Sequence, residues 1–333
     1  MSLPDGERRG ATYVSPDAAH ENGRGAMTER ARFRSYYGRP ILKEPVWTWE
    51  IPWYFFTGGL TGASSALAAG ARIAGNEAVA RRATLTALVM TAVNPALLIA
   101  DLGRPERFLN MLRLFKVTSP MSVGTWILSA HGGAATLAGS SELTGRAPRA
   151  GLAAELAGGA LGCALATYTA LLVSDTAVPA WHQARHELPF VFAGGAMASA
   201  GAAAAALSPV SEAGPARRLT VAGAALELGA AQVMEHRLGE LGEPYHEGQV
   251  EKLNQAAKGL TAAGSLLLAT AGRRSRLAAL AGGVATLAGA ACERWAIFRA
   301  GFQSARDPKY TVVPQRLRLD ERRRAMADGA TQS

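Results

Sequence analysis

Eight apolar runs constrain the fold of this chain more than any other feature. Each run is close to the roughly 20 residues that a helix needs to cross the hydrocarbon core of a membrane. The runs cover about 51–72, 82–100, 121–140, 151–174, 188–207, 218–236, 253–272 and 276–300. The sequence therefore predicts an all-α membrane protein with eight transmembrane helices.

Polar segments flank these runs at both ends of the chain. The mean hydropathy of the whole chain is only +0.07, because the two ends dilute the apolar middle. We predict a polar N-terminal tail at 1–46, a transmembrane domain at 47–302 and a basic C-terminal tail at 303–333.

The net charge of +9 is explained by membrane topology. An even number of spans places both tails on one side, together with the loops at 101–120, 175–187 and 237–252. Near the membrane, Lys and Arg are more numerous on that side than on the other. The positive-inside rule then places both termini in the cytoplasm, in a multi-pass protein of the inner (cytoplasmic) membrane. Anionic lipid accounts for the basic surface better than nucleic acid does.

A charged turn runs from Asp101 to Phe108, between the second and third runs. Pro105 suits the first turn of a helix, and we expect a short interfacial helix after it. Asp101 can complement the positive end of that helix or pair with Arg104. The alternative is an electrostatic anchor at the lipid headgroups.

The start of the first run carries a stripe of chemically varied side chains at helical spacing. It consists of Glu50, Trp53, Tyr54 and Thr57. In the fourth run, Tyr168 and Asp175 lie seven residues apart on one face. This set of side chains suits a flat lipophilic ring with two carbonyls. Aromatic side chains can sandwich the ring, hydroxyls can bond its oxygens, and a carboxylate can exchange protons with it. The alternative is a Trp/Tyr interface belt with helix-stabilising hydrogen bonds.

Small residues follow that stripe. Gly58, Gly59, Gly62 and Ala63 give the small-xxx-small spacing that lets another helix approach closely in lipid. We therefore expect a tightly packed neighbour against the first helix.

Three polar residues are predicted deep inside the membrane. Glu227 in the sixth run and His131 in the third are candidates for a proton path, with simple interhelical hydrogen bonding as the alternative. Asn94, beside Pro95, is expected to satisfy backbone groups freed by a proline kink.

The two cysteines, Cys163 and Cys292, lie singly in apolar runs. They cannot ligate an iron–sulfur cluster. A transmembrane haem needs facing ligands at one depth, but His131 is mid-span and His236 is at a helix end. We expect no metal site, haem or cluster in this chain.

Several segments together resemble the NrfD, or polysulfide reductase, membrane-subunit family. The resemblance rests on Trp49-Glu50-Ile51-Pro52-Trp53-Tyr54-Phe55-Phe56-Thr57-Gly58-Gly59-Leu60, Asp101-Leu102-Gly103-Arg104-Pro105, Thr118-Ser119-Pro120-Met121, Tyr168-Thr169-Ala170-Leu171-Leu172, Ala177-Val178-Pro179-Ala180-Trp181 and Ala300-Gly301-Phe302-Gln303-Ser304-Ala305. It covers most of the chain between Val46 and Pro308.

The resemblance implies eight helices in two four-helix bundles. It also implies electron exchange between a membrane quinone, menaquinone or ubiquinone, and a ferredoxin-like iron–sulfur subunit that serves a molybdopterin catalytic subunit. The quinone pocket of relatives lies near the start of the first helix and a tyrosine of the fourth. The matching residues are Tyr54 and Tyr168; relatives often carry His or Asn where this chain has Tyr54.

The resulting hypothesis assigns a role to each candidate residue. The quinone site would be formed by Tyr54, Tyr168, Trp53 and Asp175. Protons would be exchanged by Glu50 and Asp101, with Arg104 orienting Asp101. A proton path would be formed by Glu227 and His131. Two alternatives remain at this stage: a secondary transporter coupled through Glu227 and His131, and a purely structural membrane anchor.

Overall fold

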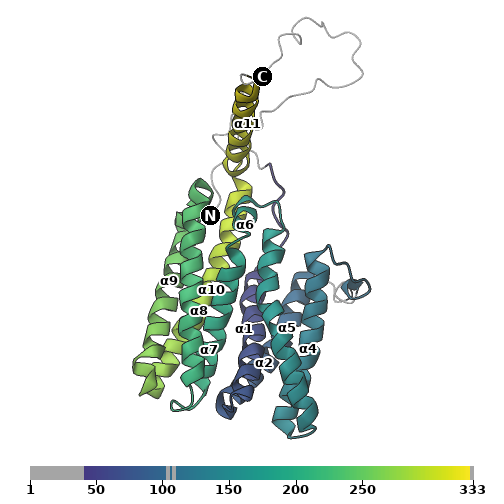
Figure 1. The fold of residues 1–333 in the computed structure, drawn as a ribbon, viewed down its shortest axis with the longest axis vertical. Coiled ribbons are helices and arrows are strands. Elements are labelled where there is room, and N and C mark those ends of the chain that lie inside the picture. The colour runs from purple at the N-terminus through teal and green to yellow at the C-terminus, as the bar shows by residue number, and fades with distance from the viewer. Residues whose placement is uncertain (1–40, 103–105, 107–109, 331–333) are drawn as a thin grey trace, which may run out of the picture. The chain divides into compact units, whose positions relative to one another are not determined.

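The computed structural model describes residues 41–102, 106 and 110–330, and all regular secondary structure in that part of the chain is helical (Figure 1). Residues Glu44–Ser304 form one compact unit, and the other described residues belong to a second. The second unit contains α11 (Lys309–Ala330), so the predicted basic C-terminal tail includes a helix.

All eight predicted apolar runs are helical. The corresponding helices are α1 (Glu50–Ile73), α2 (Glu77–Leu102), α4 (Pro120–Thr144), α5 (Pro148–Ser174), α7 (Leu188–Leu207), α8 (Gly214–Leu238), α9 (Gly248–Ala269) and α10 (Arg276–Arg306). The short elements are α6 (Pro179–Gln183), η2 (Gly239–His246) and η3 (Ala271–Arg273). Within the described residues, α2, α5 and α7 are long and apolar enough to cross a membrane. Residues 103–105 and 107–109 of the predicted interfacial helix lie outside the described residues. Of the rest, Asn110 and Met111 are helical, but 112–116 form a turn and an irregular segment, so the helix is shorter than predicted.

Local signals set the helix ends. At α4, Pro120 occupies the first turn and the Ser119 hydroxyl accepts a hydrogen bond from the Ser122 backbone. Gly145 adopts the left-handed conformation that ends this helix. Successive long helices are antiparallel, so α6 and η2 share one end of the unit with the start of α1. We call this end the tail side and the opposite end the far side.

For description, we call α1, α2, α4 and α5 the first group and α7, α8, α9 and α10 the second group (Figure 1). In the first group, α1 contacts α2 and α5, and α4 contacts α2 and α5. In the second group, α8 contacts α7 and α9, and α10 packs against α7 and α9 at Gly283 and Gly264. Helix α7 also contacts α1, α2 and α5, and thereby joins the groups.

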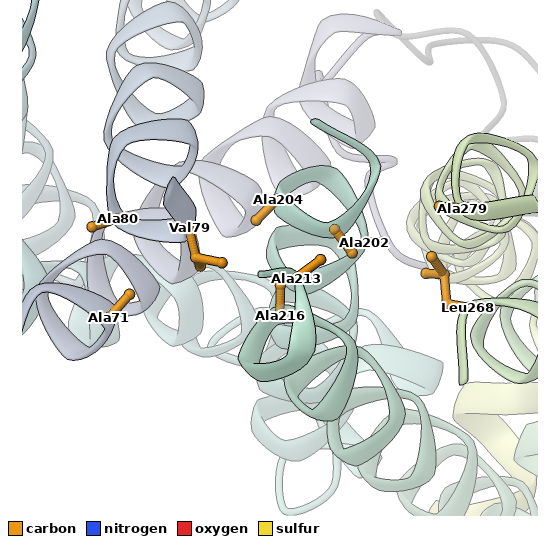
Figure 2. Packing of buried hydrophobic residues seen from close by; sticks show 10 residues of the cluster. Ala71, Val79, Ala80, Ala202, Ala204, Ala213, Ala216, Leu268 and Ala279 are labelled. Atoms are coloured by element: carbon orange, nitrogen blue, oxygen red, sulfur yellow. The ribbon is translucent and has the colours of Figure 1, made fainter. Parts of the chain in front are cut away.

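A core of small side chains connects both groups toward the far side (Figure 2). Its buried members are Ala71, Val79, Ala80, Ala202, Ala204, Ala205, Ala213, Ala216, Leu268 and Ala279. They come from α1, α2, α7, α8, α9 and α10. Since most are alanines, the helix backbones approach closely, and van der Waals contact can stabilise them in lipid.

The predicted close neighbour of α1 is confirmed. A Cβ atom built on Gly62 would lie 2.4 Å from the carbonyl oxygen of Gly162 in α5, and a Cβ on Gly162 would lie 2.3 Å from that of Gly62. On another side of α1, a Cβ on Gly59 would lie 3.3 Å from Cβ of Ala196 in α7. The glycines therefore allow α1 to contact two helices.

Gly62→Ala is expected to destabilise the protein, because the new methyl overlaps backbone that cannot rotate away. Overpacking of this kind costs roughly 1–3 kcal/mol. Thermal unfolding in detergent measures the loss. Gly70→Ala in the same helix is the control, since a Cβ there meets no atom within 4 Å. Equal unfolding midpoints for the two variants would contradict the close crossing.

Asn94 differs from its prediction. Its side-chain amide donates to the hydroxyl of Thr61 in α1 at 2.9 Å, so it bonds across helices and not to its own backbone. The Thr61 hydroxyl donates to the Thr57 carbonyl at 2.6 Å, which leaves its oxygen free to accept. The kink interpretation was wrong because Asn94 is fully buried on the side that faces α1.

Candidate functional site

A cavity of about 70 Å³ lies among the four helices of the first group, at the tail-side end. Its walls are mostly apolar, with a few polar groups. The lining residues are Trp47, Ile51, Tyr54, Phe55, Leu98, Asp101, Leu102, Met111, Met121, Thr125, Leu128, Tyr168 and Leu172. We call it the tail-side pocket. An apolar pocket with few convergent polar groups is typical of small-molecule sites.

Two buried tyrosines meet at this pocket. The phenol oxygens of Tyr54 in α1 and Tyr168 in α5 are hydrogen-bonded to each other. Sequence reasoning selected both residues, and the fold brings them together although they are 114 positions apart. One phenol proton lies between the two oxygens, so the pair can still offer the other proton to a ligand.

Gly124 in α4 makes room for the Tyr168 ring. A Cβ atom built on Gly124 would lie only 2.1 Å from Cε2 of Tyr168. Sequence reasoning missed this residue. The signal that could have found it is its position in the first turns of α4, opposite the two candidate tyrosines.

Asp101, the candidate at the end of α2, lines the pocket and holds the chain that precedes α1. One carboxylate oxygen of Asp101 accepts from the backbone N–H and from the hydroxyl of Thr48, each at 3.3 Å. The same hydroxyl also donates to Glu50. Thr48 thus bridges the two carboxylates proposed to handle protons. Arg104, the predicted partner of Asp101, lies outside the described residues.

Trp47 covers part of the pocket. Its ring stacks on that of Trp181 at 5.6 Å between centroids and meets Phe55 edge-on at 6.3 Å. Trp181 is fully buried, and its indole N–H donates to the Ile297 carbonyl in α10 at 2.7 Å. Gly301 leaves the space for this indole, since a Cβ there would lie 1.9 Å from it.

Three other candidates do not line the tail-side pocket. Trp53 is 37% exposed, and its ring contacts Trp295 of α10 at 6.2 Å. Asp175 follows the end of α5 and is exposed. Glu50 is buried and bonded to Thr48. Adjacent helical residues point about 100° apart, so Trp53 and Tyr54 face different neighbours.

The two proton-path candidates lie in different groups of helices. His131 in α4 is fully buried, and its Nε2 is 2.9 Å from the hydroxyl of Ser65 in α1. Glu227 in α8 lies against α7: a Cβ on Gly195 would be 2.6 Å from its Oε1 and 2.8 Å from Nη2 of Arg294. Glu227 therefore has a buried guanidinium as its neighbour, whereas His131 has a hydroxyl.

Sequence reasoning missed the charges around Glu227. Arg294 and Glu293 of α10 are both buried and paired. The Arg294 guanidinium also donates to the Phe192 carbonyl at 2.9 Å and lies 4.0 Å from the centroid of that ring. The sequence did contain a signal for these charges, because Glu293 and Arg294 interrupt the apolar sequence of α10.

At the tail side, burial raises the pKa of Tyr245 well above its ordinary value, and nearby carboxylates add to the rise.

Among the described residues, no cluster of three or more His, Cys, Asp or Glu side chains can hold a metal ion. Cys163 and Cys292 are free thiols in separate helices. The absence of haem and iron–sulfur clusters from this chain stays a prediction.

The long apolar helices and the pocket between them define an all-helical integral membrane protein. The family model described as polysulphide reductase, NrfD, matches residues 41–234, more than half of the chain. The chain therefore belongs to the NrfD family. Members are membrane subunits of quinone-linked oxidoreductase complexes, and they generally pair with iron–sulfur and molybdopterin subunits. A comparison with curated proteins returned no match. The matched range includes every residue that lines the tail-side pocket.

Proposed function

We propose that this chain is the quinone-reactive membrane subunit of a multi-subunit oxidoreductase. In this proposal it crosses the membrane eight times as two four-helix bundles, with both termini in the cytoplasm. The observation that carries the proposal is the hydrogen-bonded pair of Tyr54 and Tyr168 in an apolar pocket of a chain of this family.

The pocket residues have the chemistry that a quinone requires. The hydrogen-bonded phenols of Tyr54 and Tyr168 bond one quinone oxygen, while Phe55, Leu128 and Leu172 exclude water from the quinone ring. Glu50 and Asp101 exchange a proton at the tail-side end, where Thr48 links them. Trp53 and Asp175, which lie outside the lining, would act at the rim of the site.

A ferredoxin-like iron–sulfur subunit on the tail side would exchange electrons with the quinone and connect this chain to a molybdopterin subunit. His131 and Glu227 remain the proposed proton-path residues, with His131 closer to the pocket along α4. The secondary-transporter alternative requires these two residues to act together. Neither residue lines the tail-side pocket, so the pocket favours the quinone proposal over a transporter coupled through these residues.

Tyr54→Phe tests the proposal, because it removes one hydroxyl from the pocket and little volume. Losing a hydrogen bond of this kind costs on the order of 1 kcal/mol, so quinone binding should weaken several-fold. The measurement is quinone-dependent electron transfer by the complex recovered through a tag on this chain.

The partner's own reaction with a soluble redox dye is the internal control and should be unchanged in Tyr54→Phe. Tyr245→Phe, at a buried tyrosine whose hydroxyl has no hydrogen-bond partner among the described residues, is the matched control variant and should leave both rates at the wild-type value. Loss of quinone-dependent and dye-dependent rates together would assign Tyr54 to assembly. A wild-type complex with no quinone reaction would refute the proposal.

A further inference from the structure

A second cavity lies in the far-side half of the first group. Its volume is about 10 Å³, enough for about one water molecule. All four helices that form the tail-side pocket also line this cavity, which we call the far-side cavity. Its lining residues are Ser65, Ala68, Thr84, Ala87, Ala135, Ala138, Ala154, Glu155 and Gly158.

A buried carboxylate connects the far-side cavity to the far surface. Glu155 is 5% exposed and accepts from Arg72 at 3.0 and 2.9 Å and from the Thr84 hydroxyl at 3.1 Å. Arg72 also donates to Glu142 at 2.8 Å. The Glu142 side chain is 22% exposed, so the chain of charged groups reaches solvent.

The ionised form of Glu155 has a specific reason to be stable at this depth. A bidentate guanidinium–carboxylate pair can offset much of the cost of burying the charge, especially when other hydrogen bonds satisfy the oxygens. Thr84 supplies such a bond. Glu155 therefore brings a carboxylate to the wall of the far-side cavity.

Polar groups with unused hydrogen-bonding capacity lie on α2 and α4 at sequence positions between those that line the two cavities. Ser65 lines the far-side cavity and bonds His131 at 2.9 Å. Within the described residues, His131 Nδ1, Thr91 Oγ1 and Asn94 Oδ1 are buried and have no hydrogen-bond partner. Buried polar groups of this kind are usually satisfied by ordered water.

The position of His131 along α4 is intermediate between the two cavities. Leu128, one turn toward the tail side of His131, lines the tail-side pocket, and Ala135, one turn toward the far side, lines the far-side cavity. His131 thus lies between the two cavities on the same face of the helix.

We infer that a proton path from the far side to the quinone site runs through the first group, along Glu142, Arg72-bound Glu155, the far-side cavity, Ser65 and His131. The inference rests on the proposed function. It adds Glu155 as the residue that connects the far surface to the far-side cavity. It also assigns the path a direction across the membrane, from the far surface to the oxygen held by Tyr54 and Tyr168.

The stoichiometry follows from the chemistry of a quinone. Two electrons from the tail-side partner and two protons convert a quinone into a quinol. One proton reaches the tail-side oxygen through Glu50 and Asp101, and the other reaches the second oxygen through His131. Turnover in the opposite direction releases the protons by the same routes. One proton per two electrons is therefore exchanged on the far side.

Sealed vesicles containing the whole complex test this inference. Dyes trapped inside and added outside report the pH change on each side during turnover with a soluble quinone analogue and the partner's electron donor or acceptor. Wild type should exchange one far-side proton per two electrons. Glu155→Gln should slow this exchange at least tenfold, and Ser65→Ala, a smaller change, should slow it in the same direction.

Glu212→Gln is the matched control, because it removes an exposed carboxylate from the far side and should leave the exchange unchanged. Exchange of both protons on the tail side by wild type would overturn the path and leave the proposed function standing. Unchanged far-side exchange in both Glu155→Gln and Ser65→Ala would also overturn it. No quinone turnover by wild type would refute the proposed function, and the path with it.

Discussion

Gly124→Ala should lower quinone-dependent turnover by about 10²-fold while leaving the helices intact. The added methyl would lie 2.1 Å from Cε2 and 2.6 Å from Cδ2 of Tyr168, so the ring must move. Movement of Tyr168 separates its phenol from that of Tyr54. A displacement of about 1 Å in a positioning group is enough to cost roughly 10²-fold in rate.

The control for this prediction is Gly133→Ala in the same helix, where a Cβ meets no atom within 4 Å. Both variants should have helical circular dichroism like wild type, and the dye reaction of the partner should continue in both. Turnover by Gly124→Ala within twofold of wild type would mean that the position of Tyr168 is not important for the quinone reaction.

Arg294→Met should be the most destabilising substitution of those considered. It leaves the buried carboxylate of Glu293 without its guanidinium and removes the cation next to Glu227. Removing one partner of a buried ion pair costs roughly 3–5 kcal/mol, because the remaining charge is uncompensated. Thermal unfolding in detergent, together with the yield of folded protein, measures the effect.

Glu293→Gln introduced with Arg294→Met should restore part of the stability, because it removes the uncompensated charge. Arg299→Met is the control in the same helix, since its guanidinium donates to the neutral side chain of Gln249 at an exposed position and its loss leaves no buried charge uncompensated. If Arg294→Met and Arg299→Met unfolded at the same temperature, the buried pair would have no structural role.

Run length was sufficient to predict the helices. Every predicted apolar run lies in a long helix, except for the last three residues of 253–272, which follow the end of α9 at Ala269. In lipid, a segment can satisfy its backbone only internally. The ends were less accurate: α10 continues to Arg306, six residues beyond the predicted run, since apolarity ends before helical propensity does.

The candidate site was predicted in part. Tyr54, Tyr168 and Asp101 were selected from motifs, and the structure places all three around one pocket. Helical spacing grouped Trp53 with Tyr54, but spacing cannot tell which neighbour each side chain meets. Glu155 was missed, because its sequence context gives no sign that Arg72, 83 positions earlier, would pair with it.

The sequence by itself determined the helical class, the helix order, the family and the small residues that allow close packing. Only the tertiary structure decided which polar groups meet. It joined Tyr54 to Tyr168 and Glu155 to Arg72, and it placed His131 and Glu227 in different groups of helices. The physical reason is that hydropathy and spacing are local properties of the chain. A hydrogen bond between buried side chains depends on the rotation and depth of each helix, and packing between helices sets both.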